Sequence, residues 1–338
     1  MNAAAKNYDG VNKYIRITDI DEASSTYKDK DIVSPDGVLA DNYLVNNRDI
    51  LLARTGASTG KSYLYKKSDG KLYYAGFLIR ANVTTHDPYF VFSQLHTHRY
   101  WRWVSIMSAR SGQPGINSQE YSSFPIYTTS IEEESKIAKL LSLLDERIAT
   151  QNKIIDKLQS LIKGIAQNIV RNNKPNVRLS ECLECKSSTL QESDVCEQGT
   201  YPVYGANGIV GYLDNYNTEG EAVYIIKDGS GVGTVSYVKG KCSATGTLNT
   251  LQAKEGYSLQ YLYYLLKVFN FEPYKTGMAI PHIYFKDYGK AKFFCPSYTE
   301  QLQYAQLLSA IDNKLSIEQN ILTELTLQKQ CLLRQMFI

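Results

Sequence analysis

The sequence predicts an α+β protein with two strand-rich domains, each followed by one long helix, and the two helices pair as an antiparallel coiled coil. Three observations predict this fold. The 338 residues are enough for two ordinary cores. Two stretches, one central and one terminal, carry apolar residues at alternating spacings of three and four, as in a coiled coil. The second half also repeats the first, which indicates an internal pseudo-twofold repeat.

The first long helix is expected at 131–172, where strand-like alternation gives way to a helical pattern. Glu132, Glu133 and Glu134 open it, and acidic residues suit the positive end of a helix. A surface helix of a globular protein would carry a broader apolar stripe, so this narrow seam favours a partner helix. The seam consists of Ile137, Leu141, Leu144, Ile148, Gln151, Ile155, Leu158, Ile162, Ile165 and Ile169.

The end of the chain repeats this helix at 299–338. "LLSLLDERI", from Leu140, matches "LLSAIDNKL", from Leu307. We call the number of residues from Leu140 to Leu307 the repeat offset, because it separates equivalent positions of the two copies. The same offset aligns Ile116 with Ile283, which extends the repeat beyond the helices. The second seam consists of Tyr304, Leu308, Ile311, Leu315, Glu318, Leu322, Leu325, Lys329, Leu332 and Met336.

The strand-rich domains are therefore expected at 1–130 and 173–298. Aromatic residues favour strands, and the chain has 27 tyrosines, whose hydroxyls suit a hydrogen-bonding surface. The second domain has an opening segment at 176–198, where the first has only "MNAAAKNYD". We therefore expect the first domain to lack its opening strand.

The stretch "RTGASTGKSYLY", from Arg54, looks at first like a nucleotide-binding loop. Such a loop is G-x-x-x-x-G-K-[ST] between a strand and a helix, whose N-terminus faces the phosphates. Thr55 replaces the first glycine, and the chain after Ser62 alternates like a strand. A second copy, "VYIIKDGSGVGTVSYV", has no lysine in place of Lys61. We expect glycine turns with positive φ rather than ATP binding.

The sequence offers little support for catalysis or for metal binding. A DNA methyltransferase would need a cofactor loop and an [ND]-P-P-[YF] element, and "THDPYF" at 85–90 is one proline short. We interpret Asp87-Pro88 as a turn. Cys182 and Cys185 have zinc-ligand spacing, but no second pair completes the site. We therefore expect reduced thiols and no bound metal.

The segment "LHTHRYWRW", at 95–103, concentrates histidines and tryptophans. His96 and His98 have no carboxylate or cysteine nearby, so we interpret them as strand or helix-surface residues rather than metal ligands. Trp101 and Trp103 are expected in the core, because duplex DNA recognition seldom uses aromatic stacking.

The bulk composition indicates a cytoplasmic protein but does not identify its ligand. The sequence has neither a secretory signal nor an apolar run of about 18 residues, so no membrane association is expected. A net charge of +3 is nearly neutral, so DNA binding must be argued from organisation.

The order of these features resembles the specificity subunits of type I restriction–modification systems. No single motif is diagnostic, but their order, repeated twice, is typical of that family and covers nearly the whole chain. The resemblance implies that both strand-rich domains are target-recognition domains and that the chain is non-catalytic. The motifs are "YIRITDI" at 14–20, "ARTGASTGK" at 53–61, "SGQPGIN" at 111–117, "VRLSECLE" at 177–184, "YPVYGANGIVGY" at 201–212, "KDGSGVG" at 227–233 and "YTEQLQYAQLLSAID" at 298–312.

The resemblance also implies the ligand and the partners. The ligand would be double-stranded DNA with a split, asymmetric site, one domain reading each half-site. The partners would be two modification (methyltransferase) subunits and, for cleavage, restriction (translocase-nuclease) subunits. S-adenosylmethionine, ATP and Mg²⁺ would be bound by those partners rather than by this chain. Two alternatives stay open: the recognition subunit of a related type II enzyme, and a coiled-coil adaptor that binds only proteins.

Base readout needs polar and basic side chains on loops that enter the major groove. Such side chains follow the glycines and recur in "SARSGQPGIN" and "YKTGMAIPHI". For each residue taken alone, a solvated loop side chain is an equally good interpretation. The candidates in the first domain are Arg54, Ser58, Thr59, Lys61, Arg110, Ser111, Gln113 and Asn117. Those in the second domain are Lys227, Asp228, Ser230, Thr234, Lys275, Thr276 and His282.

Overall fold

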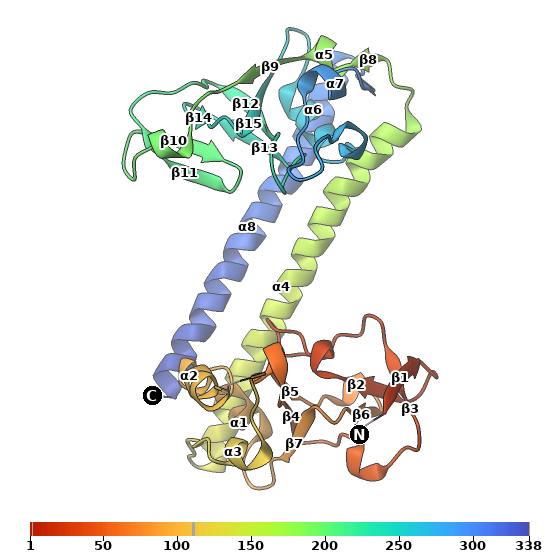
Figure 1. Ribbon diagram of the computed structural model, residues 1–338, viewed down its shortest axis with the longest axis vertical. Helices are drawn as coiled ribbons and strands as arrows, with labels where there is room; N and C mark the ends of the chain where they lie inside the picture. The colour runs from red at the N-terminus through yellow and green to blue at the C-terminus, as the bar shows by residue number, and fades with distance from the viewer. Residues whose placement is uncertain (2, 110–111, 338) are drawn as a thin grey trace. The chain divides into compact units, whose positions relative to one another are not determined.

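The computed structural model describes residues 1, 3–109 and 112–337 (Figure 1). The chain forms two compact units. Met1–Lys153 with Asn320–Ile338 make up unit 1, and Ile154–Gln319 make up unit 2. Each unit therefore contains one strand-rich region together with part of each long helix.

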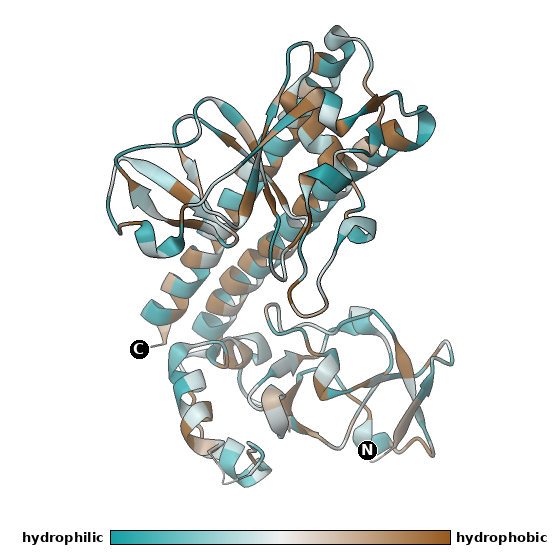
Figure 2. Cartoon of the chain, turned by 45° about the horizontal axis from the view of Figure 1, so that its top comes forward, coloured by the Kyte–Doolittle hydropathy of each residue, from teal (hydrophilic) through white to brown (hydrophobic). Residues whose placement is uncertain are grey.

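The two long helices lie where the sequence repeat predicts them. Helix α4 spans Ile131–Asn172 and helix α8 spans Tyr298–Met336. Every seam position in both helices is buried or half-buried, because the three-and-four spacing places these residues on one face. Figure 2 shows hydrophobic residues recurring between hydrophilic ones along both helices. No described helix combines the length and the apolar character that crossing a membrane would require.

Within unit 1 the two long helices pack antiparallel. Leu141 of α4 and Leu333 of α8 belong to one buried cluster. About one turn further along α4, the carboxylate of Asp145 lies 2.6 Å from the ammonium of Lys329. Residue numbers thus rise along α4 while they fall along α8, and the predicted antiparallel pairing is confirmed in this unit.

The strand-rich region of unit 1 contains three small sheets among the described residues. Strands β5, β4 and β7 form an antiparallel sheet in that order, β2 pairs with β6 in parallel, and β1 pairs with β3 antiparallel. The strands are β1 (Ala4–Asn7), β2 (Lys13–Ile15), β3 (Val33–Asp36), β4 (Asp49–Ala53), β5 (Ser62–Leu64), β6 (Leu72–Tyr74) and β7 (Leu78–Asn82). The helices are α1 (Pro88–Gln94), α2 (His98–Met107) and α3 (Ser118–Ser122).

Strand β4 lies between two hydrophobic clusters. Alternate residues of a strand point to opposite faces of the sheet. Ile50 and Leu52 accordingly join the cluster formed with α1, α2 and α3, whereas Leu51 and Ala53 join a second cluster with β5, β6 and β7. Both faces of the strand are therefore buried, which gives the loop after Ala53 a rigid starting point.

Unit 2 repeats this plan with one more strand in its main sheet. Strands β13, β12, β15 and β9 form an antiparallel sheet in that order, and smaller sheets join β11, β10 and β14 and pair β16 with β8. The strands are β8 (Val177–Arg178), β9 (Leu183–Ser187), β10 (Tyr201–Gly205), β11 (Gly208–Leu213), β12 (Glu221–Ile226), β13 (Val235–Lys239), β14 (Ser243–Ala244), β15 (Leu248–Ala253) and β16 (Lys292–Phe293). The helices are α5 (Leu179–Cys182), α6 (Leu259–Leu266) and α7 (Phe285–Tyr288).

The central strands β4 and β12 occupy equivalent places. Each is followed by a glycine loop and an antiparallel partner, β5 or β13, so the predicted order of strand, glycine turn and strand is confirmed in both units. Strand β9, the fourth strand of the unit 2 sheet, comes from the opening segment at 176–198. Among the described residues of unit 1, the corresponding sheet has three strands.

Candidate nucleic-acid interface

Four loops carry the predicted DNA-contacting residues that the structure describes. In unit 1 they are glycine loop 1, residues 54–61, and proline loop 1, residues 112–117, which ends at α3. In unit 2 they are glycine loop 2, residues 227–234, and proline loop 2, residues 275–283. The sequence singles them out separately, and the structure brings them together in pairs.

In unit 1 the two loops are joined by main-chain hydrogen bonds. The N–H of Gly56 donates to the carbonyl of Pro114 at 2.9 Å. The N–H of Ile116 donates to the carbonyl of Arg54, also at 2.9 Å. We call this pair of hydrogen bonds the loop clamp. It makes the two loops one continuous edge, although strands β5, β6 and β7 and helices α1 and α2 lie between them in sequence.

Unit 2 contains the same clamp at the equivalent positions. The N–H of Gly229 donates to the carbonyl of Pro281 at 2.9 Å, and the N–H of Ile283 donates to the carbonyl of Lys227 at 2.9 Å. Both clamps use only backbone groups, so they do not depend on the side chains that the loops present. The two domains therefore share one loop frame.

The glycines adopt the conformation that the sequence predicts. The φ angles are 71° at Gly56, 91° at Gly60, 96° at Gly229 and 91° at Gly233, in the left-handed region that favours glycine. A Cβ atom on Gly60 would also stand 2.7 Å from a methyl carbon of Val104, so the loop packs closely on α2. Strand β5 follows glycine loop 1, so the helix N-terminus that a phosphate-cradling loop requires does not follow it.

Two buried tyrosines hold glycine loop 1 from behind. The hydroxyl of Tyr121 donates to the carbonyl of Ala53 at 2.6 Å and accepts from the N–H of Gly60 at 3.1 Å. The hydroxyl of Tyr100 donates to the carbonyl of Gly60 at 2.8 Å. Burial raises the pKa of Tyr121 to about 12, so its hydroxyl keeps its proton and can donate. Sequence reasoning missed both roles.

The candidates of unit 1 differ in their access to a ligand. Arg54 and Gln113 are exposed, and Ser58 is half-buried. Arg110 and Ser111 lie outside the described residues. Arg54 and Gln113 therefore offer the most accessible guanidinium and amide groups among the described candidates of this unit.

Two other candidates of unit 1 have structural partners. Thr59 is only 8% exposed, and its hydroxyl donates to the carbonyl of Gly56 at 2.8 Å. Thr59 therefore stabilises the turn, and its contact with DNA stays a prediction. Asn117 is exposed but caps α3, because its side chain accepts from the N–H of Glu120 at 2.9 Å.

Two candidate lysines, one in each unit, form ion pairs with glutamates. The ammonium of Lys61 is 3.0 Å from a carboxylate oxygen of Glu22, and that of Lys275 is 2.6 Å from Glu272. Both glutamates are well exposed. Exposed pairs contribute at most about 1 kcal/mol, so a phosphate group could displace either carboxylate at little cost.

The candidates of unit 2 lie on glycine loop 2 and on proline loop 2. Thr276 and His282 exchange two backbone hydrogen bonds, of 2.9 and 2.8 Å, which close the loop into a hairpin. The predicted base or phosphate contacts of this set remain predictions. Its exposed members are Ser230, Thr234 and Thr276, and its half-buried members are Lys227, Asp228, Lys275 and His282.

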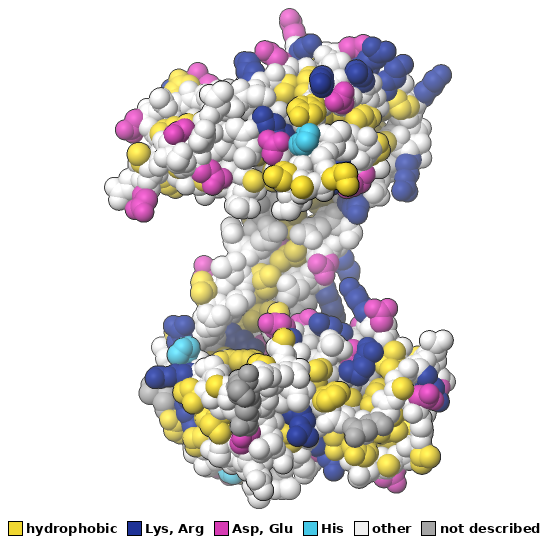
Figure 3. Space-filling model, viewed as in Figure 1, with side chains coloured by type: hydrophobic (Ala, Val, Ile, Leu, Met, Phe, Trp, Pro, Cys, Tyr) yellow, Lys and Arg dark blue, Asp and Glu magenta, His cyan; other side chains and the backbone are white. Residues whose placement is uncertain are grey.

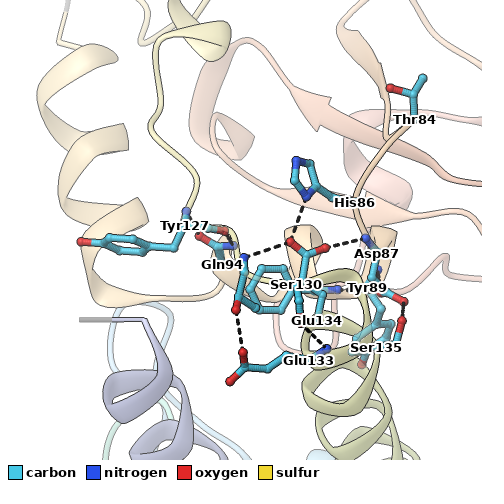
Figure 4. A network of polar contacts seen from close by, with 12 residues as sticks. Thr84, His86, Asp87, Tyr89, Gln94, Tyr127, Ser130, Glu133, Glu134 and Ser135 are labelled. Atoms are coloured by element: carbon cyan, nitrogen blue, oxygen red, sulfur yellow. Dashed lines mark hydrogen bonds and ion pairs between the residues drawn. The ribbon is translucent and has the colours of Figure 1, made fainter.

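A buried carboxylate docks the strand-rich region of unit 1 onto α4 (Figure 4). Glu134 is fully buried, and its carboxylate accepts from the backbone N–H of Asp87 at 2.9 Å. Its other oxygen lies 2.9 Å from Nδ1 of His86. Asp87 in turn caps α1 by accepting from the N–H groups of Tyr89 and Phe90. One side chain thus connects the start of α4 to the start of α1.

Unit 2 has the same joint with a neutral side chain. The repeat offset aligns Glu134 with Gln301, whose amide oxygen accepts from the backbone N–H of Ser258 at 2.9 Å. Ser258 caps α6 as Asp87 caps α1. The shared offset and the two capping residues were the sequence signals that could have revealed this joint.

A second contact fixes the same orientation in each unit. The hydroxyl of Tyr89 donates to the carboxylate of Asp145 at 2.5 Å, and that of Tyr264 donates to Asp312 at 3.2 Å. The repeat offset again aligns the two aspartates. Each strand-rich region is therefore held to its long helix at two points, which orients its loop pair.

Several expectations near 86–103 are revised. Asp87-Pro88 begins α1 and is not a turn. Trp103 packs against the cluster around β4 as expected, but Trp101 is 43% exposed, so its placement in the core was wrong. His98 is exposed at the start of α2, and the imidazole of His96 lies 3.0 Å from both the carbonyl of Phe92 and a serine hydroxyl.

The cysteines are free thiols among the described residues. Sγ of Cys182 lies 3.8 Å from Sγ of Cys295. Within the part of the chain that the structure describes, no group of three or more His, Cys, Asp or Glu side chains could hold a metal ion.

The sequence matches a protein-family model described as "Type I restriction modification DNA specificity domain" at residues 1–160 and 173–327. It is 28% identical over 116 residues to the type I restriction enzyme EcoprrI specificity subunit of Escherichia coli, covering 34% of this chain and 29% of that protein. Matches to curated relatives cover between 23% and 61% of those proteins.

Solved structures share the fold. The crystal structure of a type I restriction–modification S subunit from M. genitalium matches with a TM-score of 0.70 and 18% identity, covering 98% of this chain and 89% of that one. A chain from a study of complex assembly and conformational transition of the type I R-M system matches with a TM-score of 0.53 and 15% identity, covering 96% and 90%.

Proposed function

Because the chain belongs to the family of type I restriction–modification DNA specificity subunits, we propose that it reads a split, asymmetric DNA site, with one strand-rich domain on each half-site. The loop clamp carries this proposal. Gly56 and Ile116 in one domain, and Gly229 and Ile283 in the other, make the same backbone hydrogen bonds. Equivalent frames that present different side chains would read two different half-sites.

The side chains on the two frames favour different bases. Arginine suits guanine and glutamine suits adenine in the major groove, so Arg54 and Gln113 equip unit 1 for purines. Aspartate accepts a hydrogen bond from cytosine, and Asp228 occupies the corresponding edge of unit 2. Lys61 and Lys275 would contact phosphates, which position the protein without reading sequence.

The long helices offer equivalent docking positions for two copies of one partner. Leu140 is 46% exposed, and Leu307, its equivalent in the second copy, is 51% exposed. Exposed leucines favour apolar contact with a partner. Because equivalent leucines occur in both copies of the helix, two modification subunits could each bind one copy. Restriction subunits would join this complex for cleavage. S-adenosylmethionine, ATP and Mg²⁺ would belong to those partners, the chain itself would be non-catalytic, and the complex would act in the cytoplasm.

Methylation mapping tests the proposal directly. Deleting the gene should abolish methylation at one bipartite genomic motif, and restoring it should restore that motif. A deletion strain with an unchanged methylation pattern would refute DNA recognition. Methylation without restriction subunits, but cleavage only with them, would separate a type I system from the related type II alternative. The coiled-coil adaptor has lost support, because the family match covers both strand-rich regions.

A further inference from the structure

The tip of proline loop 2 presents apolar side chains to solvent. Met278 is fully exposed, at 108% of its reference area, and Ile280 is 66% exposed. Figure 3 shows apolar side chains gathered beside a histidine on the surface of unit 2. Exposed apolar area costs roughly 25 cal/mol per Å² relative to burial, so a tip of this kind gains free energy when a ligand covers it.

The tip is a built element of the fold. Backbone hydrogen bonds between Thr276 and His282 close its base. Gly277 has a φ of 89°, and a Cβ atom there would stand 2.3 Å from the carbonyl oxygen of Ile280. Only glycine therefore fits this turn without rearrangement. A fixed hairpin can present Met278 and Ile280 with little further ordering cost on binding.

The clamp places this tip on the candidate interface. Pro281, directly after Ile280, accepts the hydrogen bond from Gly229 of glycine loop 2. Lys275 and Thr276 lie on the opposite arm of the hairpin, at its base. The apolar side chains of the tip thus project from a base that carries polar groups suited to phosphates and bases, which favours nucleic acid over a protein partner.

The equivalent tip of unit 1 is polar. By the repeat offset, Gln113 corresponds to Ile280 and Gly112 to Ala279. One frame therefore carries an amide, and the other an aliphatic side chain, at the same position. In the major groove the apolar feature that distinguishes one base from the others is the C5-methyl group of thymine.

We propose that Met278 and Ile280 are specificity-determining residues that contact thymine methyl groups in the half-site read by the second domain. This inference rests on the proposed function. Burying one methyl group is worth about 0.8 kcal/mol, so loss of one such contact should weaken binding about fourfold.

The test uses the reconstituted complex of this chain with modification subunits and a duplex carrying the genomically mapped motif. Each thymine in turn is replaced by deoxyuridine, which pairs identically but lacks the methyl group. Fluorescence anisotropy should show about fourfold weaker binding for at least one position in a single half-site. Ile280→Ser should remove that sensitivity, while Ile209→Ser, at an exposed isoleucine of β11 in the same unit, should retain it.

The outcomes separate this inference from the proposed function. Tight motif binding that ignores every deoxyuridine, a second-domain half-site without thymine, or an Ile280→Ser complex that keeps its sensitivity would each overturn the thymine contact and leave DNA recognition standing. A complex that does not select the motif would overturn DNA recognition itself. If Ile280→Ser prevents complex assembly, the tip is a protein contact and the inference is wrong.

Discussion

The backbone N–H of Asp87 donates to the buried carboxylate of Glu134 at 2.9 Å. A charged acceptor buried at a joint leaves its partners unsatisfied when it is removed, which makes the joint sensitive to small changes. The equivalent contact between Ser258 and Gln301 shows that a neutral amide can fill the same role. The joint can therefore be dissected with isosteric substitutions.

Glu134→Ala should destabilise unit 1 by roughly 2–3 kcal/mol, because it leaves the N–H of Asp87 without its acceptor. Glu134→Gln should cost less than half as much, as Gln301 fulfils this role in unit 2. Urea unfolding measures the loss, and hydrogen exchange at residues 86–91 localises it. Glu132→Ala, at an exposed position of the same helical turn, is the control. Equal losses for the alanine and glutamine variants would contradict the proposed joint.

Tyr121→Phe should loosen glycine loop 1 without unfolding the domain. The substitution removes the hydroxyl that donates to Ala53 and accepts from Gly60, at a cost of roughly 1–2 kcal/mol. In the reconstituted complex, discrimination should weaken in the half-site of the first domain only. Tyr127→Phe, at an exposed tyrosine, should change neither quantity. Equal effects on both half-sites would argue against a local role.

His96 should make unit 1 less stable in acid. Desolvation, reinforced by the charge of Lys329 and opposed by Asp145, lowers the pKa of His96 to about 4, against an ordinary value of 6.5. Between pH 4 and pH 6.5 this residue binds more protons in the unfolded chain than in the folded chain. The contribution of His96 to the free energy of unfolding is therefore fully present above pH 6.5 and decreases as the pH falls towards 4. The loss should reach at most about 3 kcal/mol.

Unfolding free energies at pH 7 and pH 4.5 measure this effect. His96→Gln should reduce the difference between the two values, whatever its cost at pH 7. His98→Gln, at an exposed histidine, should leave the difference unchanged. A pH dependence identical in all three proteins would assign the acid sensitivity to other groups.

Lys61→Ala should weaken DNA binding by the complex with little effect on the fold, since its partner Glu22 is exposed and such ion pairs contribute little to stability. If Lys61 meets a phosphate, affinity falls for all sequences and the salt slope decreases by about one unit. If it meets a base, one half-site loses roughly 1–3 kcal/mol of discrimination. Anisotropy titrations at several salt concentrations distinguish these cases, and Lys67→Ala is the control. Unchanged DNA binding would exclude Lys61 from the interface, and loss of tight ATP binding would restore the nucleotide-loop interpretation.

Local patterns explain which parts of the fold were predictable. The seam from Ile137 to Ile169 has a helical period over ten positions, and Gly56 and Gly60 lie between an apolar run and a segment that alternates after Ser62. These features depend on neighbours in sequence, so they can be identified without coordinates. The order of the repeated motifs was also sufficient to indicate the family.

The site was less predictable because it depends on contacts between distant segments. The clamp between Gly56 and Pro114 uses backbone groups, which leave no side-chain signature. Glu134 lies in a run of three glutamates that suited a helix N-terminus, so its residue type alone did not mark it as buried. Threonine can also contact bases from an exposed loop, so the residue type of Thr59 does not distinguish the two roles. Only its hydrogen bond to Gly56 shows that it stabilises the turn.

The main-chain clamp has a consequence for how such proteins diversify. Since none of the four hydrogen bonds of the two clamps involves a side chain, mutations at Arg54, Gln113 or Ile280 should leave the scaffold in place. A few loop substitutions in one domain could therefore change the half-site that this domain reads, while the other domain keeps its half-site. New bipartite target sequences could then evolve one half at a time.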